Sequence, residues 1–186
     1  RGGVEIGAIL ARALGAELDV VLSRKLRAPS MPELAIGAVS ESGDVHLDHD
    51  TIARSEAAKS YLEQERVCQM AEIERRVKLF RAARPKATVA GRSVIITDDG
   101  IATGSTMIAA LRTVRAWQPL EIIVAVPVAP RERLEDVRPL CDRVVCLNVP
   151  DEFWAVGQFY RDFAQVSDER VVQLLGASAR PDRVSA

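Results

Sequence analysis

Residues 94–107 read VIITDDGIATGSTM, and this stretch decides the predicted fold. Three β-branched apolar residues and a threonine are followed by two adjacent carboxylates, Asp98 and Asp99, and then by small and hydroxyl-bearing residues. In an open parallel sheet, ligands bind beyond the carboxyl ends of the strands, where such a junction would lie. We therefore expect a buried strand, a ligand-binding turn and a helix that begins near Thr106.

The sequence on either side of this stretch alternates between strand-like and helix-like segments. Continuous apolar runs at 93–97, 120–128 and 143–149 have the length and composition of strands that are buried on both faces. The two segments between them, 106–117 and 131–140, have helical character. The pattern is βαβαβ, which predicts an α/β fold with an open, mostly parallel sheet flanked by helices.

The first half of the chain is expected to add six elements. These are a helix at 4–14 closed by Gly15, a strand at 17–23, a loop at 24–33, a strand at 34–40, a short strand at 45–47 after a turn at 41–44, and a long amphipathic helix at 54–83. The two short strands around the turn predict a small antiparallel flap.

Length and composition limit the classes of function. With 186 residues, 48% of them hydrophobic and 27% charged, the chain fits one globular domain. A formal net charge of −1 gives no electrostatic reason to expect nucleic acid or an anionic membrane as a partner. Three cysteines without framework or metal spacing indicate a reducing cytoplasm and no structural zinc. The longest apolar runs are too short to span a bilayer.

The chain opens on RGGVEIG, a Gly-rich turn that feeds a helix. In a parallel sheet the strand before such a turn is a central one, so we expect a further core strand ahead of Arg1 in the parent protein. We expect the domain to occupy residues 1–176 and the tail at 177–186 to be frayed.

The loop at 100–106 has the features of an anion site. Its backbone N–H groups and the following helix N-terminus favour a phosphate, and Thr103, Ser105 and Thr106 add hydroxyl donors. Asp98 and Asp99 would repel a phosphate, so they must meet another part of the ligand. A sugar phosphate satisfies both halves, with the phosphate in the loop and the hydroxyls on the carboxylates. The alternative is that the acidic pair only caps a helix; a Walker lysine and a G-x-G-x-x-G motif are both absent from this stretch.

VIITDDGIATGST is similar to the phosphoribosyl pyrophosphate (PRPP) motif of type I phosphoribosyltransferases. RGGVEIG, RKLRAPSMPELAIGAV and VPDEFWAVGQFYRDFAQVSDERV resemble a bacterial branch of the same family. The resemblance implies a mobile loop, a small C-terminal hood at about 150–166 and a Mg²⁺-dependent glycosyltransferase of nucleotide metabolism. It would move the phosphoribosyl group of PRPP to a nitrogenous base and release pyrophosphate. Some family members are regulators, so a PRPP- or nucleotide-sensing module is the alternative, and a sugar-phosphate binder or hydrolase is a third hypothesis.

By this resemblance, Asp98 and Asp99 hold the ribose hydroxyls, and the cations at the start of the mobile loop assist catalysis. The residues with implied roles are Ala102, Thr103, Gly104, Ser105 and Thr106 for the 5′-phosphate, Arg1, Gly2 and Gly3 for pyrophosphate, and Arg24 and Lys25 in the mobile loop. We also expect a homo-oligomer, specifically a dimer.

The sequence defines the residues that would bind the acceptor base less clearly. VPDEFWAVG resembles the hood of 6-oxopurine transferases, which implies that Phe153 stacks on the base, with Trp154 as the alternative, and that Asp162 is the acid beside the metal. These aromatic residues could instead be core under a lid. The family's 6-oxopurine enzymes carry an aspartate where this chain has Ala102, so we expect hypoxanthine and guanine to be poor substrates, with Glu33 as a candidate for the missing acid.

Overall fold

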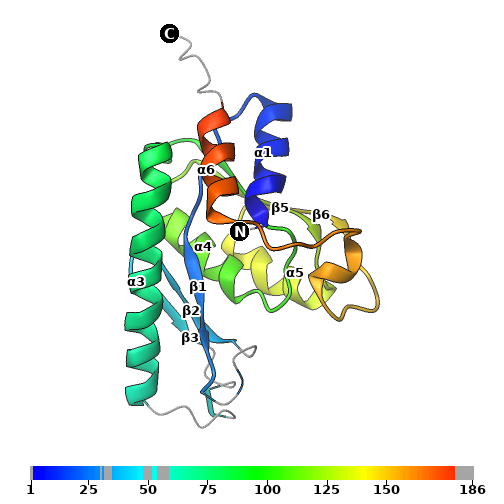
Figure 1. Cartoon of the computed structure of the whole chain (residues 1–186). Coiled ribbons are helices and arrows are strands. Elements are labelled where there is room, and N and C mark those ends of the chain that lie inside the picture. The colour runs from blue at the N-terminus through cyan, green and yellow to red at the C-terminus, as the bar shows by residue number, and fades with distance from the viewer. Residues whose placement is uncertain (1, 30, 32–34, 48–51, 54–58, 179–186) are drawn as a thin grey trace.

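The computed structural model describes residues 2–29, 31, 35–47, 52–53 and 59–178. Within these residues the chain forms helices, 3-10 turns and two three-stranded sheets (Figure 1). In chain order the elements are α1 (Gly3–Leu14), β1 (Ser23–Arg27), β2 (Ala35–Ser40), β3 (Val45–Leu47), α3 (Lys59–Ala83), β4 (Ser93–Ile96), α4 (Ser105–Ala116), β5 (Glu121–Val128), α5 (Arg131–Val137), η1 (Arg138–Leu140), β6 (Arg143–Asn148), η2 (Val156–Phe159) and α6 (Asp168–Ala177).

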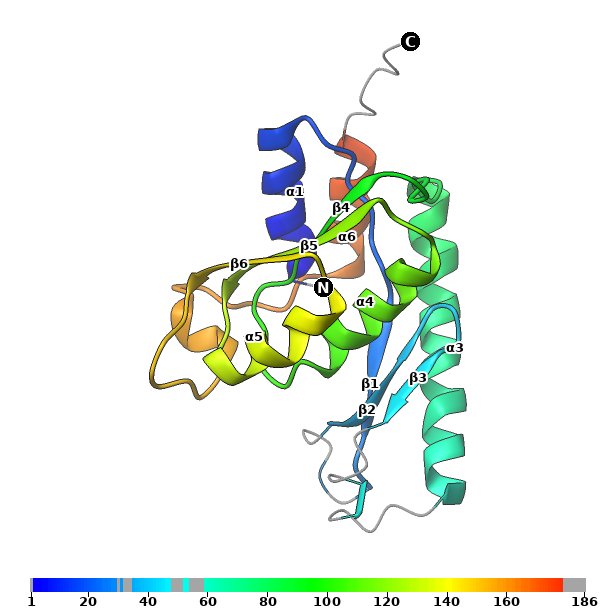
Figure 2. The ribbon, with the colours of Figure 1, turned by 180° about the vertical axis from the view of Figure 1, so that it is seen from behind.

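The second half of the chain forms a parallel sheet in the order β4-β5-β6. Along β5 alternate side chains are buried, and the buried set is Ile122, Val124, Val126 and Val128. Ile122, Val124 and Val126 share one hydrophobic core with α4 and α5, which cover one face of the sheet (Figure 2). The predicted α/β fold with a parallel sheet flanked by helices is confirmed.

The prediction that these strands are buried on both faces was wrong for β6. Val145 and Leu147 lie on the face away from α4 and α5, where their exposed fractions are 43% and 83%. Ile95 of β4, on the same face, is 37% exposed. The apolar run of β6 therefore predicted a strand correctly but carried no information about what packs on its second face.

The predicted antiparallel flap is confirmed by the pairing of β2 with β3, and β1, whose residues 24–27 were predicted as a loop, adds a third strand to this sheet. Side chains of β1 and β2 pack on the long helix α3, where Leu26, Ile36 and Ile73 are almost fully buried. Both views place this sheet alongside α3 and α4, below the parallel sheet (Figures 1 and 2). Residues 54–58, predicted as the first turn of the long helix, lie outside the described residues.

Helix α1 ends where its sequence predicts. Gly15 adopts a left-handed conformation (φ 62°), which glycine reaches without steric cost, and the helix stops there. Val4 is buried against α6 and Phe80, so α1 and α6 lie side by side at one end of the molecule (Figure 1).

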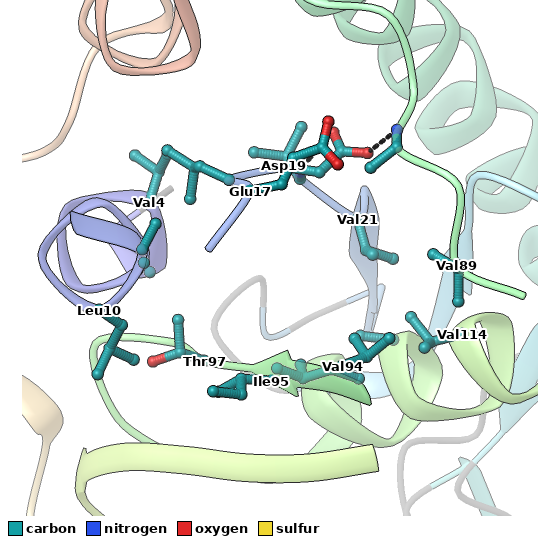
Figure 3. A pocket seen from close by; sticks show the side chains of 18 of the residues that line it. Val4, Leu10, Glu17, Asp19, Val21, Val89, Val94, Ile95, Thr97 and Val114 are labelled. Atoms are coloured by element: carbon teal, nitrogen blue, oxygen red, sulfur yellow. Dashed lines mark hydrogen bonds between the residues drawn. The ribbon is translucent and has the colours of Figure 1, made fainter. Parts of the chain in front are cut away.

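Residues 17–22 were predicted as a strand, and this prediction was wrong: β1 begins only at Ser23 and pairs within the flap. A cavity of about 510 Å³ separates this segment from β4, the edge strand of the parallel sheet (Figure 3). Val21 lines one side of the cavity, and Val94 and Ile95 line the other (Figure 3). Among the described residues the segment pairs with no neighbouring strand, and the cavity lies between it and β4.

Within the described residues, the helices are too short or too polar to cross a lipid bilayer.

Candidate functional site

The two aspartates of the DDG motif lie directly beyond the carboxyl end of β4. The strand ends at Ile96, and Asp98 and Asp99 follow after one residue. The backbone N–H of Asp99 donates to Oδ1 of Asp98 over 2.9 Å, which fixes the first carboxylate against the turn. Both side chains are half-buried, so neither carboxylate is freely hydrated.

Burial makes this pair difficult to ionise. The pKa of Asp98 is raised above its usual range because its carboxylate is desolvated, an effect that hydrogen bonds from Asp99 and Gly3 partly offset. The pKa of Asp99 is raised to about 6, first by burial and then by the negative charge of Asp98. A ligand that donates hydroxyl hydrogen bonds to these oxygens would relieve both penalties.

The start of α1 packs directly on the acidic pair. A Cβ atom added to Gly2 would lie 1.9 Å from Oδ2 of Asp99, and one added to Gly3 would lie 2.8 Å from both Cα and Oδ1 of Asp98. Only glycine fits at both positions. This close approach brings the positive end of the α1 dipole beside the carboxylates, at the edge where a further anionic group could bind.

The loop after the aspartates turns into α4 at Gly104. This residue has φ 82°, and its carbonyl accepts the first helical hydrogen bond, from the N–H of Ile108. The N–H groups of the first turn have no partners inside the helix and point toward the loop. Ala102 and Thr103 are exposed, while Ser105 and Thr106 are half-buried. The five predicted phosphate residues thus form one turn at a helix N-terminus.

The two predicted catalytic cations point in different directions, because successive side chains of β1 alternate between faces. The guanidinium of Arg24 donates to Gln69 and pairs with Glu72 over 3.8 Å, both on α3. Lys25 is exposed, and its positive charge lowers the pKa of Asp98, which places it on the side of the acidic pair. Both residues lie in a strand rather than in a loop.

The segment predicted as a hood contacts the turn after β4 at two points. Val156 is buried, and a Cβ atom added to Gly100 would lie 2.9 Å from both of its methyl groups. The hydroxyl of Tyr160 donates to the backbone carbonyl of Asp99 over 2.6 Å. Tyr160 had no assigned role in the sequence interpretation, since its aromatic ring was indistinguishable from core.

The predicted base-side residues are less closely tied to the acidic pair. The ring of Phe153 stacks on Phe159 with centroids 5.6 Å apart, and Trp154 is 86% exposed. The carboxylate of Asp162 accepts the N–H of Ala164 over 3.1 Å. The roles of Phe153, Trp154 and Asp162 stay predictions. Arg1 and Glu33 lie outside the described residues.

One further cation lies near the loop at 100–106. The side chain of Arg133, on α5, passes 3.9 Å from the position of a Cβ atom added to Gly104. Its guanidinium pairs with Asp136 over 2.7 Å. No local pattern pointed to this residue, because α5 follows a different strand and only the parallel sheet brings it to the loop.

In the described part of the chain, three or more acidic, histidine or cysteine side chains do not gather at any one point. The acidic pair lies just beyond the end of β4 and directly precedes the loop. Mg²⁺ is usually held by one or two carboxylates together with water and ligand phosphates. The residues present fit that mode of binding and do not form an all-protein cage.

Comparison with known proteins agrees with this geometry. The family model described as phosphoribosyl transferase domain matches residues 1–164, and the chain belongs to this family. Two Mycobacterium tuberculosis proteins, MT0597 from strain CDC 1551 / Oshkosh and Rv0571c from strain ATCC 25618 / H37Rv, are provisionally named phosphoribosyl transferases. Each is 39% identical over 180 residues, which is 97% of this chain and 41% of the relative. The chain thus spans about two fifths of the length of these relatives.

A solved structure is similar over nearly the whole chain. The crystal structure of TT1426 from Thermus thermophilus matches with a TM-score of 0.77 and 45% sequence identity, over 97% of this chain and 85% of that chain. The fold and the family resemblance predicted from the sequence are both confirmed.

Proposed function

We propose that this domain transfers the 5-phosphoribosyl group of PRPP to a nitrogenous base and releases pyrophosphate. The observation that carries the proposal is the juxtaposition of a half-buried carboxylate pair, Asp98 and Asp99, with an open helix N-terminus at Gly104. The carboxylate pair favours hydrogen-bond donors or positive charge in a ligand, whereas the helix N-terminus favours negative charge. A ribose bearing a 5′-phosphate offers hydroxyl donors to the first and an anion to the second.

The phosphate would bind the backbone N–H groups that begin α4, with hydroxyls from Thr103, Ser105 and Thr106. The ribose hydroxyls would donate to Asp98 and Asp99. Departure of pyrophosphate from C1 leaves positive charge on the ribose ring, which fixed carboxylates beneath the ring would stabilise. Preorganisation of this kind is usually the largest single contribution to catalysis.

The leaving group would lie toward Gly2 and Gly3, where the α1 N-terminus carries positive partial charge. Lys25 would add a full positive charge on the same side. Mg²⁺, bound through pyrophosphate oxygens and the acidic pair, would supply further neutralisation of the leaving group. Arg1 belongs to this proposal through the family resemblance alone.

The nature of residue 102 restricts the base. Ala102 is exposed in the loop and has no proton to exchange, so it offers no general acid or base catalysis at a purine ring. We expect turnover with hypoxanthine or guanine to be far below the range of about 1 to 1,000 per second typical of enzymes. Rapid conversion of guanine to its monophosphate would contradict this expectation.

A sensing module is the second candidate function, and the position of Arg24 favours it. Its guanidinium is bound to Gln69 and Glu72 of α3 instead of reaching toward the acidic pair. A domain of this kind would bind PRPP or a nucleotide and release no pyrophosphate.

The test is incubation of the protein with PRPP, Mg²⁺ and a pooled set of nucleobases, followed by mass spectrometry for nucleoside monophosphates. The transferase predicts one new monophosphate and an equal amount of pyrophosphate. Binding of PRPP without either product indicates the sensor, and loss of PRPP without a nucleotide indicates a hydrolase. The Asp99→Asn variant is the matched control, since it keeps the shape of the site and removes one charge. A homodimer is part of the proposal, and light scattering after size-exclusion chromatography tests it.

A further inference from the structure

Tyr160 makes a hydrogen bond to the acidic turn from a distant part of the chain. Its hydroxyl donates to the backbone carbonyl oxygen of Asp99 over 2.6 Å, across 61 positions in the sequence. The pKa of Tyr160 is raised by burial and by the negative charges of Asp99 and Asp98. The hydrogen bond therefore ties Tyr160 directly to the backbone of the acidic pair.

This bond acts on a single peptide group. The carbonyl of Asp99 and the N–H of Gly100 belong to one planar unit, so holding the first fixes the direction of the second. The N–H of Gly100 faces the Asp99 carboxylate closely enough to lower its pKa. Tyr160 thus orients, through one rigid peptide, an N–H group that acts on the Asp99 carboxylate.

The tyrosine is itself held in place. Its ring packs on Phe163 with centroids 5.2 Å apart, and the ring of Phe163 lies so close to Gly157 that an added Cβ atom would be 2.9 Å away. Val156, from the same turn, packs on Gly100. The Tyr160 ring thus packs on a residue that is itself packed on Gly157, and the neighbouring Val156 is packed on Gly100, so the hydroxyl has little freedom to follow the turn and restrains it instead.

We propose that Tyr160 is a positioning residue that orients the Asp99 carboxylate toward the ribose hydroxyls of the ligand. The proposal rests on the proposed function, because it assumes that Asp99 accepts hydrogen bonds from a sugar. A purely structural role, in which Tyr160 only attaches the segment at 150–166 to the domain, predicts a different result in the following experiment.

The experiment measures what the sugar hydroxyls contribute to binding. Isothermal titration calorimetry compares ribose 5-phosphate with tetrahydrofurfuryl phosphate, which has the same ring and phosphate but no ring hydroxyls. The dissociation constant of tetrahydrofurfuryl phosphate divided by that of ribose 5-phosphate isolates the hydroxyl contribution, since the phosphate contribution cancels in this ratio. It is measured for the wild type, Tyr160→Phe and Tyr61→Phe. Tyr61 is a matched control because its hydroxyl also donates to a backbone carbonyl, that of Arg27, over 3.0 Å.

We expect Tyr160→Phe to reduce the ratio by about tenfold, since hydrogen bonds to charged groups contribute about 1.5–3 kcal/mol when well aimed. Tyr61→Phe should leave the ratio unchanged. Affinity for tetrahydrofurfuryl phosphate should stay within about twofold in both variants, because the phosphate loop is untouched. A structural role alone would lower the melting temperature or both affinities and leave the ratio unchanged.

The outcomes separate the two proposals. If the wild type does not distinguish the two ligands, the proposed function fails at the ribose site. If the wild type distinguishes them and Tyr160→Phe does so equally well, the positioning role is overturned. Should Tyr160→Phe not fold, Phe163→Leu keeps the hydroxyl but loosens its support, and a folded variant with an unchanged ratio overturns the proposal in the same way.

Discussion

Replacing Gly3 by alanine tests whether the start of α1 is really pressed against the acidic pair. The added Cβ atom would lie 2.8 Å from Cα and Oδ1 of Asp98 and 2.9 Å from the carbonyl oxygen of Thr97. Two of these three atoms belong to the main chain and cannot rotate away, so α1 must shift outward. Overpacking of this kind costs about 1–3 kcal/mol of unfolding free energy. The shift would also remove the hydrogen bond from Gly3 to the Asp98 carboxylate.

For a protein of this size, each kcal/mol changes the melting temperature by about 2–4 °C, so Gly3→Ala should melt lower by roughly 2 to 12 °C. Its affinity for ribose 5-phosphate should fall by about tenfold, because the Asp98 carboxylate loses its orientation. Thermal unfolding and calorimetric titration measure the two effects.

Two other helical glycines provide controls for this substitution. Gly176 of α6 has no neighbour within 4 Å of an added Cβ atom, so Gly176→Ala should stabilise by up to about 1 kcal/mol and leave binding unchanged. In Gly7→Ala the added Cβ atom would lie 2.9 Å from the flexible end of Leu18, so the melting temperature of this variant should lie between those of the other two. The reasoning is refuted if Gly3→Ala melts and binds like Gly176→Ala, since α1 would then not be held where the structure has it.

Three further predictions concern the acidic pair, the loop and the cavity. Because the pKa of Asp99 is raised to about 6 from its ordinary 3.8, the unfolding free energy should decrease as pH rises from about 4 to 6, by about 1–2 kcal/mol after allowing for partial exposure. Affinity for ribose 5-phosphate should instead increase as pH rises through 6. In Asp99→Asn, urea unfolding and calorimetric titration should show that both the stability and the affinity depend less on pH. If either pH dependence persists in this variant, a group other than Asp99 causes it. Gly104→Val should abolish phosphate affinity, because valine is strained at the φ of 82° that this loop residue adopts. Gly91→Val, with φ 70° at a surface turn, should lower the unfolding free energy by a similar amount, about 1–3 kcal/mol, without loss of binding. Equal phosphate affinities in the two variants would rule out the loop as the anion site. We also propose that an extended strand ahead of Arg1 fills the cavity of about 510 Å³ beside β4. Amide hydrogen exchange at β4 should then be slower in a longer polypeptide that includes the preceding residues than in residues 1–186. Equal exchange rates in the two polypeptides would argue against such a strand.

Segments with a strong local pattern were predictable from the sequence. The apolar run of β5 and its position between two helical segments were sufficient to predict a parallel sheet, because an apolar run of that length has few other places in a globular domain. Gly15 marked the end of α1 for an equally local reason, since a left-handed residue is needed there. The acidic pair and its loop were found together because they are adjacent in sequence.

Features that depend on distant neighbours were not predictable. The segment at 17–22 has the composition of a strand, but a strand needs a partner, and the described structure has a cavity there. Arg24 and Lys25 looked equivalent in sequence, whereas alternation along β1 sends one to α3 and the other toward Asp98. Tyr160 reaches the site only through the packing of the chain's last quarter onto the turn after β4.

The most direct measurement of the ligand assignment is a crystal structure of the protein with ribose 5-phosphate and Mg²⁺. The phosphate should lie against the backbone N–H groups of residues 103–106, and the ribose hydroxyls should be within hydrogen-bonding distance of the carboxylates of Asp98 and Asp99. A phosphate bound elsewhere, or a sugar whose hydroxyls point away from both aspartates while the phosphate occupies the loop, would contradict it.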